Sequence, residues 1–126
     1  DYDDISNKDF TVFINPEIVK KIGPMEEDFE GCLSVPDIYG KVPRYQSVKV
    51  KALNEAGEPF RVTAHGFLAR LLQHETDHTH GILFIDHIKN TKTAFFQMNT
   101  EGSIEPLDYE KSIKNNSLLW DTHEED

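Results

Sequence analysis

His74-Glu75-Thr76-Asp77-His78 forms the pattern H-E-x-x-H inside the strongest helical stretch of the chain, residues 66–81. An α-helix turns by about 100° per residue, so the two histidines lie about 40° apart, one turn along the same face. Both imidazoles can therefore bind one metal ion. Glu75 lies about 100° round from His74, where its carboxylate can reach a metal-bound water more easily than the ion itself.

Cys32 offers a third ligand and is the only cysteine of the chain. A single cysteine allows no internal disulfide, so its thiol is a metal ligand, a nucleophile or a buried apolar residue. Two imidazoles and one thiolate leave one position of a tetrahedral ion open, as in catalytic zinc sites. The combination predicts a metal-dependent hydrolase. The alternative is a pair of exposed histidines beside a solvated Glu75 on a helix surface.

Other polar side chains near this pattern have more than one interpretation. Asp77 is either a charge on the helix surface or the partner of a buried arginine, Arg44, that holds the metal-bearing helix in place. His87 is a candidate hydrogen-bond partner of a metal ligand. Otherwise the remaining histidines are expected at the surface or in satisfied polar contacts: His65, His80, His87 and His123.

Apolar periodicity and turn residues predict a short series of strands before and after one main helix. Alternation favours a hairpin whose turn contains Gly57, and Gly81 is the expected C-terminal cap of the helix. Pro16 and Pro24 are expected to interrupt the chain. The expected elements are strands over residues 10–14, 46–53 and 60–64, a turn over 54–57, the helix over 66–81, a buried run over 82–85 and an apolar cluster over 93–98.

Composition excludes several classes of protein. The 126 residues favour one domain, and 13 Lys and Arg against 23 Asp and Glu give a net charge of −10. Nucleic-acid binding needs clustered cations, so no direct nucleic-acid partner is expected, and an anionic membrane is equally unsuitable. No apolar run approaches the roughly 20 residues of a membrane-spanning helix. A reducing cytosol is the expected environment for the lone thiol.

The segments around Cys32 and His74 resemble a known family. Residues 30–34, Glu-Gly-Cys-Leu-Ser, and residues 73–78, Gln-His-Glu-Thr-Asp-His, look like the second and third motifs of peptide deformylase. The separation of 42 positions between Cys32 and His74 is also similar to that of the family. The resemblance runs from about Phe13 to Ile88. Four further segments match its general pattern: residues 15–17, 42–44, 66–70 and 81–86.

The resemblance implies an α+β fold, with antiparallel strands around one central helix that carries the H-E-x-x-H motif. We expect one domain over residues 1–126, corresponding to the C-terminal portion of the family's domain. Residues 1–9 would form a loop, residues 10–88 the family-like core and residues 89–126 a C-terminal extension. No helix is evident in that extension, and residues 103–126 are expected to be irregular with an edge strand as an alternative.

The same resemblance implies removal of the formyl group from the N-formylmethionine of newly made polypeptides, a step of N-terminal methionine processing in protein biosynthesis. One divalent metal would be bound by Cys32, His74 and His78, with Fe²⁺ as the expected ion and Zn²⁺, Ni²⁺ or Co²⁺ as alternatives. Glu75 would move the proton of the attacking water to the leaving amine. The backbone N–H of Leu33 would stabilise the oxyanion.

The substrate-binding residues implied by the resemblance surround the same site. Phe67 and Leu71 precede His74 on one helical stripe and are expected to line a pocket beside the metal. With Glu30 and Arg70 they would border the methionine side chain, and Gly31 would offer backbone hydrogen bonds to the peptide. An N-formylmethionyl peptide, met near the ribosome, is the expected partner, in a bacterial cytoplasm or an organelle.

One motif of the family is absent from this chain. Family members carry an earlier glycine-rich motif that ends in a glutamine, which supplies a second oxyanion donor. We expect an upstream fragment of the same protein to supply it. The alternatives are a short form with altered activity and a non-catalytic remnant that binds metal or peptide. A zinc-dependent endopeptidase also uses H-E-x-x-H and would take its third ligand from His80, His87 or Glu101.

Overall fold

The computed structural model describes residues 2–5, 12–32 and 35–121, which form mixed α and β structure. The chain divides into two compact units. Unit 1 comprises Asp1–Glu26 and Arg44–Thr79, and unit 2 comprises Glu27–Pro43 and His80–Asp126. The two long strands β2 (Ile14–Cys32) and β3 (Val35–Leu53) pair with each other and pass through both units. The expected α+β class is therefore confirmed.

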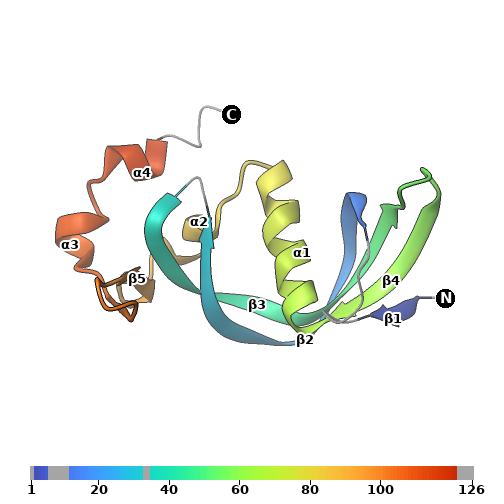
Figure 1. The fold of residues 1–126 in the computed structure, drawn as a ribbon, viewed down its shortest axis with the longest axis horizontal. Coiled ribbons are helices and arrows are strands. Elements are labelled where there is room, and N and C mark those ends of the chain that lie inside the picture. The colour runs from blue at the N-terminus through green and yellow to red at the C-terminus, as the bar shows by residue number, and fades with distance from the viewer. Residues whose placement is uncertain (1, 6–11, 33–34, 122–126) are drawn as a thin grey trace. The chain divides into compact units, whose positions relative to one another are not determined.

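Unit 1 is built on a hairpin and one helix (Figure 1). Strand β4 (Pro59–His65) pairs antiparallel with β3 from Ser47 opposite His65 to Leu53 opposite Pro59. Alternation along both strands turns one apolar row towards helix α1 (Gly66–Thr79), which packs on it. This confirms the hairpin and the main helix expected from the sequence. The buried residues of this core are Val48, Val50, Val62, Ala64, Ala69 and Leu72.

Residues Asp3–Ile5 form strand β1, whereas a loop was expected over residues 1–9. It pairs in parallel with β4, from Asp3 opposite Val62 to Ile5 opposite Ala64. This parallel pairing occurs in addition to the expected antiparallel pairing, which β3 and β4 form. The polar sequence of β1 carries no alternating apolar signal, so the strand depends on its pairing with β4 rather than on its own residues.

Strand β2 also differs from the expectation. Phe10 lies outside the described residues, and the strand begins at Ile14 and continues where Pro16 and Pro24 were expected to interrupt it. Asn15 and Gly23 adopt positive φ angles of 51° and 81°, which bend the strand locally without ending it. Proline is tolerated at the edge of a sheet, because its missing N–H costs no ladder bond when it faces away from the neighbour.

Unit 2 has its own core, formed by short elements after the main helix. They are α2 (Phe84–Ile88), the 3₁₀ helix η1 (Lys92–Ala94), β5 (Phe95–Met98), β6 (Ile104–Pro106), α3 (Tyr109–Ser112) and α4 (Ser117–Asp121). Strand β5 pairs antiparallel with β3, where Gly40 is opposite Phe95, and then with β6. The fully buried side chains include Phe84, Ile85, Phe95 and Ile113.

The C-terminal extension is more ordered than expected. The irregular structure expected over residues 103–126 is wrong for β6, α3 and α4, whereas the alternative of an edge strand agrees with β6. The Trp120 indole donates to the Ile113 carbonyl at 2.7 Å, and its ring lies edge-on to Phe95. Elements of three to five residues are too short to give a periodic signal, so their order comes from this packing.

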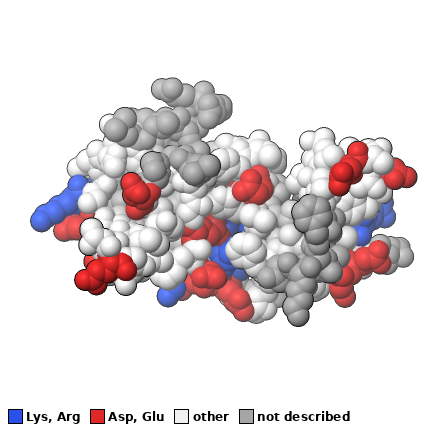
Figure 2. All heavy atoms as spheres, in the orientation of Figure 1, with Lys and Arg blue, Asp and Glu red and all other residues white. Residues whose placement is uncertain are grey.

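Figure 2 shows carboxylate side chains at several places on the visible face, in keeping with the net charge of −10. No helix in the described part of the chain is long and apolar enough to cross a membrane.

Among the described glycines, Gly40 is the one where an added Cβ atom would come closest to a neighbouring side chain. A Cβ atom there would lie 2.5 Å from the Ile88 Cδ1 and 2.9 Å from the Phe84 ring. We expect Gly40→Ala to lower the free energy of unfolding by about 1–3 kcal/mol, because overpacking forces neighbouring side chains to shift. Urea denaturation checks this, with the exposed neighbour Lys41→Ala as the control; equal stabilities would contradict the packing described.

Glu110 is held by two lysines on the surface of unit 2. The hydrogen bond from Lys92, at 3.1 Å, and then that from Lys114 hold the pKa of the Glu110 carboxyl below its ordinary value of 4.5. A lowered pKa means that this group stabilises the fold above pH 4.5 and loses that effect as pH falls through the folded-state pKa. The difference in unfolding free energy between the wild type and Glu110→Gln should therefore shrink below pH 4.5. A difference independent of pH would contradict this.

Candidate active site

Helix α1 presents the residues of the H-E-x-x-H pattern in unit 1. Gly66 has a φ of 62°, a left-handed conformation that lets the chain turn from the end of β4 directly into the helix. Gly81, with a φ of 74°, lies just beyond the last helical residue, as expected for a C-terminal cap. The helix is thus bounded by two glycines, and its last two turns carry His74 and His78.

The two imidazoles lie side by side on α1. Their ring centroids are 5.8 Å apart and their planes differ by only 17°, so the two residues are neighbours on one helix face, as their spacing of four residues predicted. His74 is buried, with 9% of its surface exposed, and His78 is half-buried. Two neighbouring imidazole nitrogens of this kind suit Zn²⁺, Fe²⁺, Co²⁺ and Ni²⁺ alike.

Glu75 lies beside the first histidine and faces solvent. Its Oε1 is 3.9 Å from the His74 Nε2, which is too long for a hydrogen bond. The side chain is 60% exposed, so its carboxylate is accessible to water next to the imidazole. This arrangement allows Glu75 to exchange a proton with a water molecule near His74.

Arg44 and Asp77 form an ion pair between β3 and α1 within unit 1. The Arg44 Nη1 donates to the Asp77 Oδ2 at 2.5 Å, and the two side chains are 4% and 23% exposed. This is the pairing considered from the sequence, and it fixes the α1 turn that lies between the two histidines. A charge-assisted bond of this kind is shorter and stronger than a neutral one.

Gln73 is an anchor of α1 that the sequence interpretation missed. Its buried amide accepts a bond from the Tyr45 N–H at 3.1 Å and donates to the Tyr45 carbonyl at 2.9 Å and to the Ala69 carbonyl at 3.0 Å. The side chain therefore pairs with β3 as a neighbouring strand would. The sequence offered one signal for this role: Gln73 directly precedes His74 on the buried side of the helix.

Three residues expected around the substrate also lie on α1. Phe67 and Leu71 are 61% and 41% exposed, although both are apolar. Arg70 is buried, and its guanidinium donates to the Glu26 carbonyl at 2.6 Å. Within unit 1 these residues therefore form an exposed apolar stripe beside a fixed cation.

The remaining expected site residues belong to unit 2. Cys32 is half-buried at the end of β2, and Glu30 is buried. A Cβ atom at Gly31 would lie 3.0 Å from the Tyr39 ring, so the small residue lets this ring approach the strand. Leu33 lies outside the described residues.

The other histidines differ in their surroundings. His65 is in the satisfied polar contact that was one expectation, because its Nδ1 is 2.7 Å from the Ser47 Oγ and its Nε2 is 3.2 Å from the Asp4 Oδ1. His80 and His87 are exposed. His123 lies outside the described residues.

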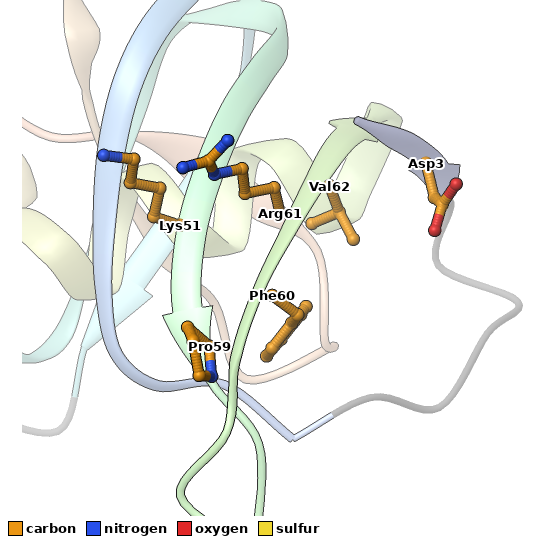
Figure 3. Close-up of a pocket in the computed structure, with 6 residues that line it drawn as sticks. All are labelled: Asp3, Lys51, Pro59, Phe60, Arg61 and Val62. Carbon is orange, nitrogen blue, oxygen red and sulfur yellow. The ribbon is translucent and has the colours of Figure 1, made fainter. Parts of the chain in front are cut away.

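A hollow of about 590 Å³ lies elsewhere in unit 1 (Figure 3). Figure 3 shows the Lys51 and Arg61 side chains extending together on one side of the hairpin, away from Asp3 on β1. None of the expected catalytic, metal-binding or substrate-binding residues lines it. The lining residues are Asp3, Lys51, Pro59, Phe60, Arg61 and Val62.

Comparisons with known proteins agree on one family. The family described as polypeptide deformylase matches residues 1–94. Peptide deformylase 1 of Pseudomonas syringae is 52% identical over 81 residues, which are 64% of this chain and 48% of the relative. Peptide deformylase 1 of Bacillus subtilis is 47% identical over 89 residues, which are 71% of this chain and 55% of the relative. The chain thus spans about half the length of the curated relatives it matches.

Solved structures give the same result. A peptide deformylase of Acinetobacter baumannii bound to Met-Ala-Ser has a TM-score of 0.60 at 49% identity, over 62% of this chain and 49% of that one. A peptide deformylase of Synechococcus elongatus in complex with actinonin has a TM-score of 0.59 at 47% identity, over 61% of this chain and 42% of that one. Both the sequence and the fold are therefore similar to those of deformylases.

The Arg44–Asp77 pair predicts the effect of a charge change. Asp77→Asn would remove the carboxylate that accepts the Arg44 bond, and we expect a loss of about 3 kcal/mol in unfolding free energy. Chemical denaturation measures this loss. Lys92→Gln, which breaks an exposed pair, is the control and should cost under about 1 kcal/mol. Similar small losses in both variants would show that the pair does not hold α1.

Proposed function

This chain belongs to the polypeptide deformylase family, and from that premise we propose that it hydrolyses the formyl amide at the N-terminal methionine of newly made polypeptides. The observation that carries the proposal is the pair of parallel imidazoles on α1 with the exposed Glu75 carboxylate beside them. The family match and the bacterial deformylases of about 50% identity support the reaction. The bacterial relatives also support a bacterial cytoplasm or an organelle as its location.

The family implies a divalent metal, and the donor set fits one. We propose His74, His78 and Cys32 as ligands, because the family match includes the segments that carry these two imidazoles and this thiol. Two imidazoles and one thiolate form a site that leaves a position open for water. Fe²⁺ is the proposed ion, with Zn²⁺, Ni²⁺ or Co²⁺ as substitutes, since this donor set accepts each of them.

The proposed mechanism assigns proton transfer to Glu75. A divalent ion in such a site lowers the pKa of a bound water and polarises a carbonyl oxygen. Glu75 accepts the proton of the attacking water and delivers it to the leaving amine, which its exposed position beside His74 supports. The backbone N–H of Leu33 is the proposed donor to the oxygen of the formyl group.

The proposed substrate pocket uses the apolar stripe of α1. Phe67 and Leu71 would contact the methionine side chain, with Arg70 and Glu30 at its border. Gly31 would present backbone hydrogen-bonding groups to the peptide. The high exposure of the two apolar side chains supports this assignment, as does the Met-Ala-Ser peptide bound to the A. baumannii relative.

The test is deformylation of formyl-Met-Ala-Ser by the purified chain, prepared without oxygen and loaded with Fe²⁺ or Ni²⁺. We expect Glu75→Ala to lower kcat by roughly 10²–10⁴-fold, because it removes the proton-transferring group. Its metal content, measured by mass spectrometry, should stay at one ion per chain. Glu55→Gln, an exposed glutamate in the β3–β4 turn, is the control and should keep full activity.

Other outcomes would separate the alternatives. Stoichiometric metal without turnover would leave two explanations, an enzyme that requires the upstream fragment or a remnant that only binds metal or peptide. Adding the upstream fragment back would separate them, because only the first would then turn over. Cys32→Ala should abolish tight metal binding in both of these cases. Retention of metal in Cys32→Ala would overturn the ligand set and point to a zinc endopeptidase with a different third ligand.

A further inference from the structure

The β5–β6 hairpin of unit 2 carries an exposed apolar surface that the proposed chemistry does not use. Along β5, Phe95 is fully buried in the core of unit 2, so its neighbour Phe96 and then Met98 lie on the opposite face. Residues directly opposite in an antiparallel pair share a face, and Ile104 is opposite Met98 while Pro106 is opposite Phe96. The outer face of this hairpin is therefore apolar at every position.

Strand β2 extends this surface within unit 2. The Phe29 ring meets the Phe96 ring edge-on, with centroids 5.0 Å apart and an interplanar angle of 88°. Phe29 is 40% exposed, Met98 49% and Ile104 38%. We call Phe29, Phe96, Met98, Ile104 and Pro106 the hairpin face.

The inner face of the same hairpin is well packed, so the exposed apolar side chains on the outer face do not result from a poorly packed hairpin. Phe95 packs there against Tyr109 and Trp120, and the Gln97 amide donates to the Glu105 carboxylate at 3.0 Å. The hairpin thus places its polar pair on the side of the core and the exposed Met98, Ile104 and Pro106 on the other side. Contiguous apolar surface rimmed by polar residues is typical of protein interaction sites.

The charged residues next to the hairpin face are mostly acidic. Glu101 lies in the turn that joins β5 to β6, Glu27 lies two residues before Phe29, and Asp37 lies two residues before Tyr39, which is paired with Phe96. All three are exposed. Lys41 is the exposed cation on this part of β3. Three carboxylates against one ammonium favour a cationic occupant.

We propose that the hairpin face binds a basic amphipathic segment of a partner protein. Apolar side chains of that segment pack on Met98, Ile104 and the Phe29–Phe96 pair, while its lysines and arginines meet the surrounding carboxylates. Methionine suits such a role because its unbranched side chain adapts to different apolar shapes. This binding is independent of the proposed deformylation, since no expected catalytic or metal-binding residue lies on the hairpin face.

The probe is a fluorescein-labelled synthetic helix of leucine and lysine, with leucines at i, i+3, i+4 and i+7 so that one stripe is apolar. Fluorescence anisotropy measures its affinity for the full chain. We expect Met98→Ser/Ile104→Ser to weaken binding by roughly tenfold or more, because the change removes apolar contact area without altering charge. Ile82→Ser, another exposed apolar residue of unit 2, is the matched control and should bind as the wild type does.

Two further comparisons test the electrostatic half of the proposal. Glu101→Gln should weaken binding and reduce its dependence on salt, whereas Glu55→Gln, also an exposed turn glutamate, should change neither. A peptide with glutamates in place of the lysines should not bind. Near-identical melting temperatures would show that all variants are folded.

Three outcomes would overturn the proposal. Equal affinity of Met98→Ser/Ile104→Ser and the wild type would mean that the lysines bind acidic surface without using the hairpin face. Binding of the acidic peptide would remove the argument from charge. Dimerisation of the wild-type chain, seen by light scattering and lost in Met98→Ser/Ile104→Ser, would identify a second copy as the occupant instead.

Discussion

The position of α1 on β3 is the constraint on which unit 1 depends. Apolar packing of Ala69 and Leu72 gives the helix a buried face, but apolar contact alone does not fix its rotation. Gln73 and Asp77 supply the directional part, through the backbone of Tyr45 and the guanidinium of Arg44. Because these two anchors flank His74, a rotation of the helix that displaced the imidazoles would also break these hydrogen bonds. Buried polar groups are costly when unpaired, so the two anchors resist such rotation.

The sequence predicted the elements whose signals are local and strong. The alternation over residues 46–53 and 60–64 and the turn containing Gly57 led directly to the β3–β4 hairpin. The spacing of His74 and His78 predicted two neighbouring imidazoles on one helix face, because residues four apart lie about one turn along the same face. Such features need no knowledge of the remainder of the chain.

Features that depend on distant partners were missed. Strand β1 is polar and exists through its pairing with β4, and β2 continues past Pro16, next to Asn15 in a left-handed conformation. The role of Gln73 depends on the identity of the strand beneath α1, which the sequence of the helix does not contain. In unit 2, Ile113 is a buried core residue that the sequence pattern did not indicate, because α3 is too short to show a periodic signal. Tertiary contact, rather than propensity, decides these cases.

The prolines of β2 have a consequence for the chain in concentrated solution. In the described part of unit 1, β2 pairs with β3 alone, so its other edge offers backbone groups that a foreign strand could recruit. Pro16 and Pro24 remove donors from this strand, the bends at Asn15 and Gly23 interrupt its straight course, and Lys20 and Lys21 place adjacent charges along it. A fibril template needs a long, flat and uncharged edge. The same irregularities that disguised this strand in the sequence therefore discourage the chain from polymerising through it.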